Sequence, residues 1–342
     1  MERADDRISY ILPLRSGTSQ VTSDLTAYLQ AIAAQAEVIV VDGSGPDVFA
    51  AHALGWQSIV RHVAPDPALA TPMGKVGGVL TGLHLASHER VIIADDDVRY
   101  DASTLGRVAA ALDSADVVRP QNHFVPMPWH AAWDTGRALL NRTSGGDWPG
   151  TLAVRRSMLA RTGGYDGRAM FENLELVRTV LAAGGRETVL LDAYVARRPS
   201  TVRHFWSQRV RQAYDELARP QRLAWQLAVL PVTITLAMAA GWIGVAAEAT
   251  IVAGIAEVGR RRAGGARIFP LRASLLAPLW LAERALCSWM AIGARVFLGG
   301  VPYRGTVLRH AATPMRVLRL RHAVRSPAPP HPEPTVPRRR SA

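Results

Sequence analysis

The sequence is poor in two reactive side chains, cysteine and lysine. Cys287 is the one cysteine among 342 residues, which excludes an internal disulfide and fits a reducing compartment. Lys75 is the one lysine among 40 basic residues, and the others are all arginine. A compact ammonium contacts a phosphate differently from a guanidinium, so Lys75, in the flexible run 74–78, is a candidate phosphate ligand. The alternative is that this single lysine remains in the sequence by chance.

Net charge is absent from residues 1–222, which hold 24 acidic and 24 basic side chains. Residues 304–342, in contrast, hold nine arginines and one glutamate. Most of the net charge of +12 therefore lies near the C-terminus, and anionic lipid headgroups rather than nucleic acid are the expected partner. The charged N-terminus leads straight into a strand-like run, so we expect no signal peptide.

Three consecutive acids, Asp95–Asp97, follow the short apolar run 91–94, which is typical of a buried parallel strand. They would then lie at the C-terminal tip of the strand, where open α/β sheets bind ligands. Adjacent carboxylates repel each other unless a cation neutralises them, and oxygen ligands favour Mg²⁺ or Mn²⁺, which often bridge to phosphates. The acids indicate an enzyme that handles a metal-bound diphosphate. A solvated acidic turn or a helix cap is the alternative.

Strand-like and helix-like segments alternate over the first 200 residues. This alternation predicts an α/β fold with a doubly wound, mostly parallel sheet, in which Asp42 and Asp95 share one cleft at strand tips. Pro13 is expected to close the first strand. The predicted strands are 8–12, 37–41, 91–94, 116–119 and 151–154, and the predicted helices are 25–36, 76–87 and 104–112.

After Pro220 the composition becomes apolar. Residues 223–255 carry one charge, Glu248. At about 1.5 Å per residue they exceed a single bilayer crossing of about 30 Å. Gly241 and Gly244 mark a predicted bend between two helices. The arginines that follow favour a hairpin that returns to the cytoplasmic side.

A third apolar stretch, 271–298, could span the membrane or lie re-entrant in it, so the number of crossings stays open. A buried core of a soluble helical domain is the alternative for the whole apolar region. We expect three parts: a catalytic domain over 1–222, membrane helices over 223–303, and a basic, proline-rich tail over 304–342. The tail is expected to be disordered from residue 326 onward.

Six motifs, in order and at matching spacing, resemble those of one enzyme family. The chain resembles, over about residues 1–215, a family 2 glycosyltransferase with the GT-A nucleotide-sugar-binding fold. It looks most like the membrane-bound branch, which includes ceramide glucosyltransferase-like enzymes and polysaccharide synthases. The resemblance implies a Rossmann-like mixed sheet with helices on both faces, followed by C-terminal transmembrane or interfacial helices. The matching motifs are Val40–Ser44, Gly74–Lys75 with Thr81–Gly82, Asp95–Asp97, Gly163–Asp166, Phe171–Glu175 and Gln208–Arg211.

The resemblance implies a role for each matching residue. Asp42 would contact the base or ribose of a UDP- or GDP-sugar donor, and Lys75 would lie near its base or diphosphate. Asp95 and Asp97 match the DxD acids: Asp97 would ligate Mg²⁺ or Mn²⁺, and Asp95 would help to bind the metal or the ribose. The metal would neutralise the departing nucleoside diphosphate, and a single displacement would invert the anomeric carbon.

The general base of the resembled family is commonly an Asp that follows Glu near the acceptor. This chain has Asn173 at that position, and an amide cannot take the proton. Glu172, just before it, and Glu175, one helical turn on, are the candidate bases. Glu172 is favoured because it matches the motif's acid. For Glu175 the alternative is a first-turn carboxylate that interacts with the helix dipole.

Gln208 and Arg211 match a QxxRW signature, which in the family lies at the membrane surface beside the acceptor and the diphosphate. Arg211 offers a planar fork suited to phosphate. Gln212 replaces the tryptophan, which disfavours a processive role, and an amphipathic interfacial helix is the alternative. Asp147 could line the acceptor side and Trp148 could stack on a sugar. A capped loop with a core tryptophan is the other interpretation of these two.

The sequence therefore predicts a membrane-anchored inverting glycosyltransferase with a cytoplasmic active site and a lipid or lipid-linked acceptor. Two hypotheses from other classes remain. The first is a GT-A-like sugar nucleotidyltransferase, whose arginine-rich glycine loop near the N-terminus is only weakly resembled by Leu14–Gly17. A degenerate, non-catalytic membrane scaffold is suggested by Asn173 and the missing tryptophan, although Lys75, Asp95 and Asp97 are retained.

Overall fold

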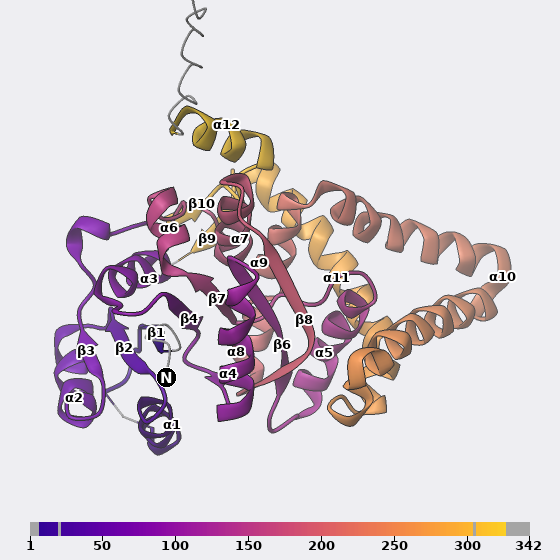
Figure 1. The fold of residues 1–342 in the computed structure, drawn as a ribbon. Coiled ribbons are helices and arrows are strands. Elements are labelled where there is room, and N and C mark those ends of the chain that lie inside the picture. The colour runs from indigo at the N-terminus through magenta and orange to yellow at the C-terminus, as the bar shows by residue number, and fades with distance from the viewer. Residues whose placement is uncertain (1–6, 20–21, 304–305, 326–342) are drawn as a thin grey trace, which may run out of the picture.

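The computed structural model describes residues 7–19, 22–303 and 306–325. Eight strands form one mixed sheet in the order β3-β2-β1-β4-β7-β6-β8-β5, and β9 and β10 form a separate pair (Figure 1). The tail expected to be disordered from residue 326 lies outside the described residues. The strands are β1 (Ile8–Leu14), β2 (Glu37–Asp42), β3 (Arg61–Val63), β4 (Arg90–Ala94), β5 (Val98–Arg99), β6 (Val117–Phe124), β7 (Thr151–Arg155), β8 (Glu187–Arg197), β9 (Val301–Tyr303) and β10 (Thr306–Leu308).

The helices fall into two groups, those that flank the sheet and those that follow them in the chain (Figure 1). The flanking helices are α1 (Ser23–Ala33), α2 (Pro46–Trp56), α3 (Gly74–Leu85), α4 (Ala102–Ala110), α5 (Trp129–Arg142), α6 (Arg156–Thr162), α7 (Glu172–Ala182), α8 (Val202–Ser207) and α9 (Arg209–Tyr214). Helix α10 (Pro220–Arg261) extends from the domain, whereas α11 (Leu271–Phe297) and α12 (Met315–Arg325) pack against it. The short 3-10 helix η3 (Asp215–Ala218) precedes α10.

Alternation along the strands divides the apolar side chains between two cores. In β1, Ile11 packs with Val76 and Val79 of α3 on one face. Tyr10 and Leu12 pack with residues of α1 and α4 on the other face. Because successive strand side chains point to opposite faces, each face needs a covering layer. The predicted α/β mixed sheet with helices on both faces is confirmed.

The strand directions bring the loops of interest to one edge of the sheet. β1, β2, β3 and β4 run parallel, so the residues after β2 and β4 lie at the same edge. β7 runs antiparallel to β4 and begins at Thr151 opposite Ala94. The loop that precedes β7 therefore lies directly beside the three acids, and the Asp95 N–H donates to the carbonyl of Gly150 at 2.9 Å.

Three details differ from the sequence prediction. β1 does not end at Pro13 but runs to Leu14. Its ladder with β4 ends at Ile11, so the missing proline N–H costs no hydrogen bond on that side. β6 runs on to Phe124 because it pairs with the long strand β8. The sequence analysis also predicts no element at 46–63, 129–142 or 187–197, which contain α2 and β3, α5, and β8.

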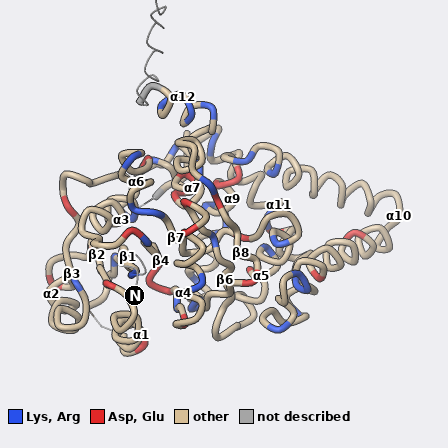
Figure 2. The backbone as a smooth tube through the Cα atoms, viewed as in Figure 1, with Lys and Arg blue, Asp and Glu red and all other residues tan. Residues whose placement is uncertain are grey.

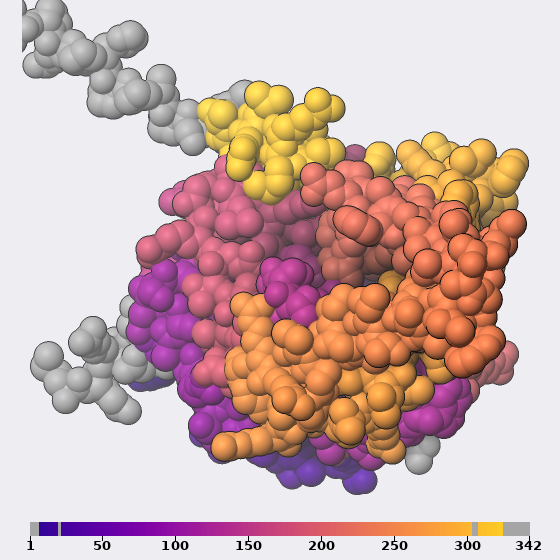
Figure 3. All heavy atoms as spheres, turned by 90° about the vertical axis from the view of Figure 1, so that its right-hand side faces the viewer, coloured from indigo at the N-terminus to yellow at the C-terminus, as the bar shows by residue number. Residues whose placement is uncertain are grey.

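Helix α10 is a hairpin. Gly241 has φ 61° and ψ −146°, which breaks the helix at the predicted bend. The two arms lie side by side: Thr233 Oγ1 donates to Glu248 Oε2 at 2.8 Å, and a Cβ added at Gly244 would lie 2.6 Å from the carbonyl oxygen of Leu236. The arms project from the domain, and in Figure 3 the orange helices cover one face of the molecule.

Helix α11 lies against the α/β domain. Gly136 allows α5 and α11 to approach closely, because a Cβ added at Gly136 would lie 2.9 Å from the Cα of Ala277 in α11. Arg209 of α9 donates to Asp134 of α5 at 2.7 Å and to Glu283 of α11 at 2.5 Å. The Glu283 carboxylate of this apolar helix therefore faces the domain, where Arg209 neutralises it.

We predict opposite effects for one substitution at two helical glycines. Gly136→Ala should destabilise the protein by about 1–3 kcal/mol, because its Cβ would push α11 away from α5. Gly106→Ala, on an open face of α4, should stabilise it by about 0.5–1 kcal/mol through helix propensity. Thermal unfolding of the two purified variants beside the wild type measures both signs. Equal midpoints would show that α5 and α11 are not closely packed.

Candidate active site

The acids after β4 are neutralised by two basic side chains. Lys75 Nζ, in the first turn of α3, lies 2.5 Å from Asp95 Oδ1 and 2.6 Å from Glu172 Oε1 at the start of α7. Arg197, at the end of β8, lies 2.7 Å from Asp97 Oδ2 and 3.5 Å from Asp95 Oδ2. The structure therefore brings together Lys75, Asp95, Asp97 and Glu172, which come from three separate motifs of the sequence.

Burial and the neighbouring charges shift the pKa values of this cluster in opposite directions. Burial by itself would lower the pKa of the Lys75 ammonium, but the carboxylates of Asp95 and Glu172 outweigh it and hold that pKa well above its usual range. Burial would raise the pKa of Asp95, yet Lys75 and Arg197 lower it. Lys75 thus stays positively charged and Asp95 negatively charged at neutral pH.

A cavity of about 190 Å³, here named the central cavity, opens beside this cluster. The side chain of Trp148 lies between Arg119, 4.2 Å from its ring centre, and Phe171, 5.0 Å between ring centres. Asp147 accepts from Asn141 Nδ2 at 2.7 Å and lies 3.2 Å from Arg137. Its acidic and aromatic lining residues are Asp95, Asp147, Trp148, Phe171, Glu172, Asp215 and Glu216, and its arginines are Arg137, Arg197, Arg219, Arg222 and Arg284.

Glu175 lies apart from the central cavity. Its side chain is fully buried on α7, and Oε2 accepts the N–H of Thr313 at 2.6 Å. Burial, the largest influence, raises the pKa of this carboxyl. Asn173 lines the cavity and donates from Nδ2 to the carbonyl of Pro149 at 3.0 Å, which ties α7 to the loop before β7.

Gln208 and Arg211 lie together, because Arg211 donates to Gln208 Oε1 at 2.8 Å. Both line a second, mostly apolar pocket of about 800 Å³, here named the apolar pocket, between α8, α9 and the end of α11. A smaller cavity of about 110 Å³ adjoins both: it shares Gln208 with the apolar pocket, and Arg197 and Gln212 with the central cavity. The three hollows are therefore neighbours that share lining side chains.

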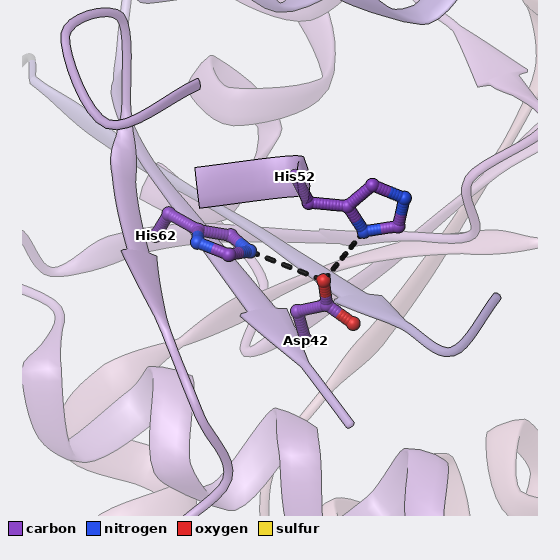
Figure 4. Close-up of side chains that lie close together, drawn as sticks. All are labelled: Asp42, His52 and His62. Atoms are coloured by element: carbon purple, nitrogen blue, oxygen red, sulfur yellow. Dashed lines mark hydrogen bonds and ion pairs between the residues drawn. The ribbon is translucent and has the colours of Figure 1, made fainter. Parts of the chain in front are cut away.

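Asp42 is held by two histidines that the sequence analysis missed (Figure 4). His52 Nδ1 and His62 Nε2 lie 2.7 and 3.1 Å from Asp42 Oδ2, and the Ser44 N–H donates to Oδ1 at 2.9 Å. Burial would raise the pKa of Asp42, but hydrogen bonds from His62, Ser44 and His52 hold it well below its usual range. The Asp42 side chain has no exposed surface, so contact with a nucleotide, which stays a prediction, requires a side-chain shift.

The same three side chains could hold a metal ion. Structural zinc sites almost always close with four ligands, whereas the described residues supply three here. Hydrogen bonds already satisfy the carboxylate, so the cluster fixes Asp42 without an ion. Two elements bring the histidines to Asp42. The pairing of β3 with β2 places His62 beside Val40, and helix α2 carries His52.

Asp215 and three arginines of the central cavity were also missed. Asp215 follows Arg211 by one helical turn, a spacing that places both on one face. Arg137, Arg219 and Arg284 each have a buried Nε with no hydrogen-bond partner among the described residues. Buried polar atoms without partners are uncommon, and these three donors fit a site built for an anion.

We predict that His62→Leu will destabilise the protein by about 1–3 kcal/mol at pH 7, since buried Asp42 loses a donor. The pKa of Asp42 is lowered in the native state, so its contribution is present above its unfolded pKa of about 4 and is lost as the pH falls further. The difference from the wild type should therefore be constant above about pH 4 and shrink as the pH falls below it in denaturant titrations. His84→Leu, at an exposed site on α3, is the control. A pH-independent difference would contradict the ionised state of Asp42.

Comparisons with known proteins give distant likenesses. No family model and no curated protein matches the chain. Among solved structures, mannosyltransferase PcManGT from Pyrobaculum calidifontis, in complex with GDP-Man and Mn²⁺, has a TM-score of 0.48 at 19% identity, over 83% of this chain and 88% of that one. S. aureus TarS has a TM-score of 0.40 at 20% identity over 62% of this chain, which spans 40% of TarS. A mycobacterial protein has a TM-score of 0.40 at 16% identity, over 58% of this chain and 70% of that one. Likenesses at this level leave the activity to be argued from the residues.

Proposed function

We propose that the protein is a glycosyltransferase that transfers a sugar from a UDP- or GDP-sugar to a lipid or lipid-linked acceptor at a membrane surface, with inversion at the anomeric carbon. One observation carries the proposal. Lys75, Asp95 and Glu172, each singled out from a different motif, meet at one edge of the sheet beside the central cavity.

The donor's diphosphate suits the charges of this cavity. Lys75 and Arg197 already face the acids after β4, and Arg137, Arg219 and Arg284 present further positive charge. Guanidinium groups bind phosphate through paired hydrogen bonds, and in a buried site such bonds are stronger than in water. We infer that these side chains orient the diphosphate and that Trp148 borders the sugar.

Asp95 and Asp97 are the residues that would hold Mg²⁺ or Mn²⁺. Asp97 Oδ1 is buried and has no hydrogen-bond partner among the described residues, and a carboxylate oxygen left free beside two more acids fits a hard divalent cation. When bound, such an ion would stabilise the negative charge of the leaving nucleoside diphosphate. Lys75 and Arg197 would keep the acids in place around it.

The α10 hairpin and α11 are proposed to attach the domain to the membrane. Both contain segments long and apolar enough to cross a bilayer. Both arms of the hairpin expose large apolar side chains, including Trp225, Met238, Trp242 and Ile251. Figure 2 shows the charges gathered at the base of α10, and its outer part mostly uncharged.

The hairpin also favours one topology. Its second arm returns to the domain, where Arg262 donates to the carbonyl of Arg142 at 2.7 Å. The arginine cluster at 260–262 therefore lies on the side of the catalytic domain, which is the cytoplasmic side if positive charge stays inside. A lipid acceptor would then reach the central cavity through the apolar pocket, past Gln208 and Arg211.

The first test is nucleoside diphosphate release by detergent-purified protein from UDP-glucose, UDP-galactose, UDP-N-acetylglucosamine and GDP-mannose, with and without Mn²⁺ or Mg²⁺ and vesicles of bacterial lipid. We expect metal-dependent release from one donor, reduced roughly a hundredfold or more by Asp97→Ala. Asp192→Asn, at an exposed acid paired with Arg107, is the control and should keep the wild-type rate. Neither release nor donor binding across the panel would favour the scaffold hypothesis instead.

A second test addresses the hairpin tip. Met238 and Trp242 are 84% and 79% exposed on either side of Gly241. Met238→Asp combined with Trp242→Asp should release much of the protein from sedimented membranes, because both charges must enter or cross the hydrocarbon core when the hairpin inserts, and each costs roughly 2.5–3.5 kcal/mol at the bilayer centre. Leu54→Asp, at an 81% exposed leucine of α2, should not change the membrane-bound fraction. Equal membrane binding of all three proteins would exclude insertion of the tip.

A further inference from the structure

The two acids proposed from the sequence as the general base, Glu172 and Glu175, each have another partner in the structure. Glu172 Oε1 lies 2.6 Å from the Lys75 ammonium, and that pairing holds the cluster together. Glu175 is fully buried against Thr313, away from the central cavity. Position 173 is an asparagine that donates to Pro149. Transfer to a hydroxyl needs a proton acceptor, so another group of the cavity has to supply it.

Asp215 is a carboxylate that lines the same cavity from η3. The described ion pairs of the neighbouring acids engage Asp95 with Lys75, Asp147 with Arg137, and Glu216 with Arg219. Asp215, in contrast, forms no ion pair among the described residues, and its Oδ1 is buried there without a hydrogen-bond partner, as is Oε2 of Glu216. A buried carboxylate oxygen without a partner is costly in a folded protein and calls for a functional explanation.

The charges that surround Asp215 come from four elements. Burial is the largest influence and raises the pKa of Asp215 to about 7. Arg211 of α9 opposes this shift, Glu172 of α7 and Glu216 of η3 add to it, and Arg219 at the start of α10 opposes it. A base whose pKa lies near neutral pH is well matched to proton transfer, because it is both ionised and basic enough to accept a proton.

We propose that Asp215 is the general base of the transferase proposed above, and that it takes the proton from a hydroxyl group of the acceptor. The acceptor O–H bond breaks and its proton moves to the Asp215 carboxylate. The oxygen forms the new bond to the anomeric carbon. The bond from that carbon to the donor's phosphate oxygen breaks, and its electron pair leaves with the nucleoside diphosphate.

This assignment narrows the acceptor class. A phosphate oxygen is already ionised at neutral pH and needs no base, whereas a hydroxyl does. The acceptor is therefore a lipid that presents a hydroxyl, and its apolar part would occupy the apolar pocket beside Met290, Phe297 and Leu298. The product is a glycoside linked through an ether-type oxygen and not a sugar phosphodiester.

The experiment compares Asp215→Asn with the wild type in release of nucleoside diphosphate from the donor found above, with vesicles of bacterial lipid as acceptor. Removal of a general base should lower kcat roughly a hundredfold or more, with the KM for the donor unchanged within about threefold. We expect the wild type to lose activity on the acidic side of about pH 7, and this limb should disappear in the variant. Asp192→Asn is the control and should keep both rate and pH profile.

Three outcomes separate this proposal from the proposed function. If the wild type releases nothing from any donor, both fail. If the wild type is active and Asp215→Asn keeps its rate within about threefold, or the lipid product is a phosphodiester, the assignment of Asp215 fails alone. If Asp215→Asn is unfolded by thermal melting, Asp215→Glu decides. Partial activity with a retained acidic limb supports the base, and full activity without that limb overturns it.

Discussion

The ion cluster in which Lys75 joins Asp95 to Glu172 is the interaction on which the rest of the site depends. It connects α3, the end of β4 and the start of α7, three elements that are distant in the sequence. Removing the ammonium would leave two half-buried carboxylates facing each other, and buried charges without partners are strongly destabilising. The position of α7, and with it the loop held by Asn173, therefore follows from one amine.

A comparable arrangement joins the apolar helices to the domain. Arg209 is 2% exposed and engages Asp134 and Glu283 at once, so α5, α9 and α11 share one buried charge centre. Small residues at Gly136 and Ala277 allow the same helices to pack closely. The expected boundary at residue 222 therefore divides the sequence by composition, whereas α11 in the folded protein packs on the domain. The apolar helices and the candidate active site share one packed support in this way.

Much of the fold followed from local patterns. Apolar runs such as 91–94 and the alternation of strands with helices predict the parallel strands β1 to β4, and the bend at Gly241 follows from glycine itself. The antiparallel pairings of β7 and β5, which make the sheet mixed, did not follow from that pattern. The Asp42 cluster could not be predicted, because β3 is three residues long and its histidine reaches Asp42 through strand pairing. Asp215 was missed for a related reason. Its importance comes from a cavity that α7, α9 and α11 enclose together, and no spacing within one segment encodes such an enclosure.

The scarcity of lysine means that a reagent for ε-amino groups would modify one known position of the chain. Lys75 carries the chain's one ε-amino group, and it is protonated and enclosed by carboxylates in the described state. Acylating reagents attack the neutral amine, so they would modify this side chain slowly while the cluster is closed. Covalent labelling of the lysine would therefore report the opening of one particular cavity, without the background that dozens of surface amines give in most proteins.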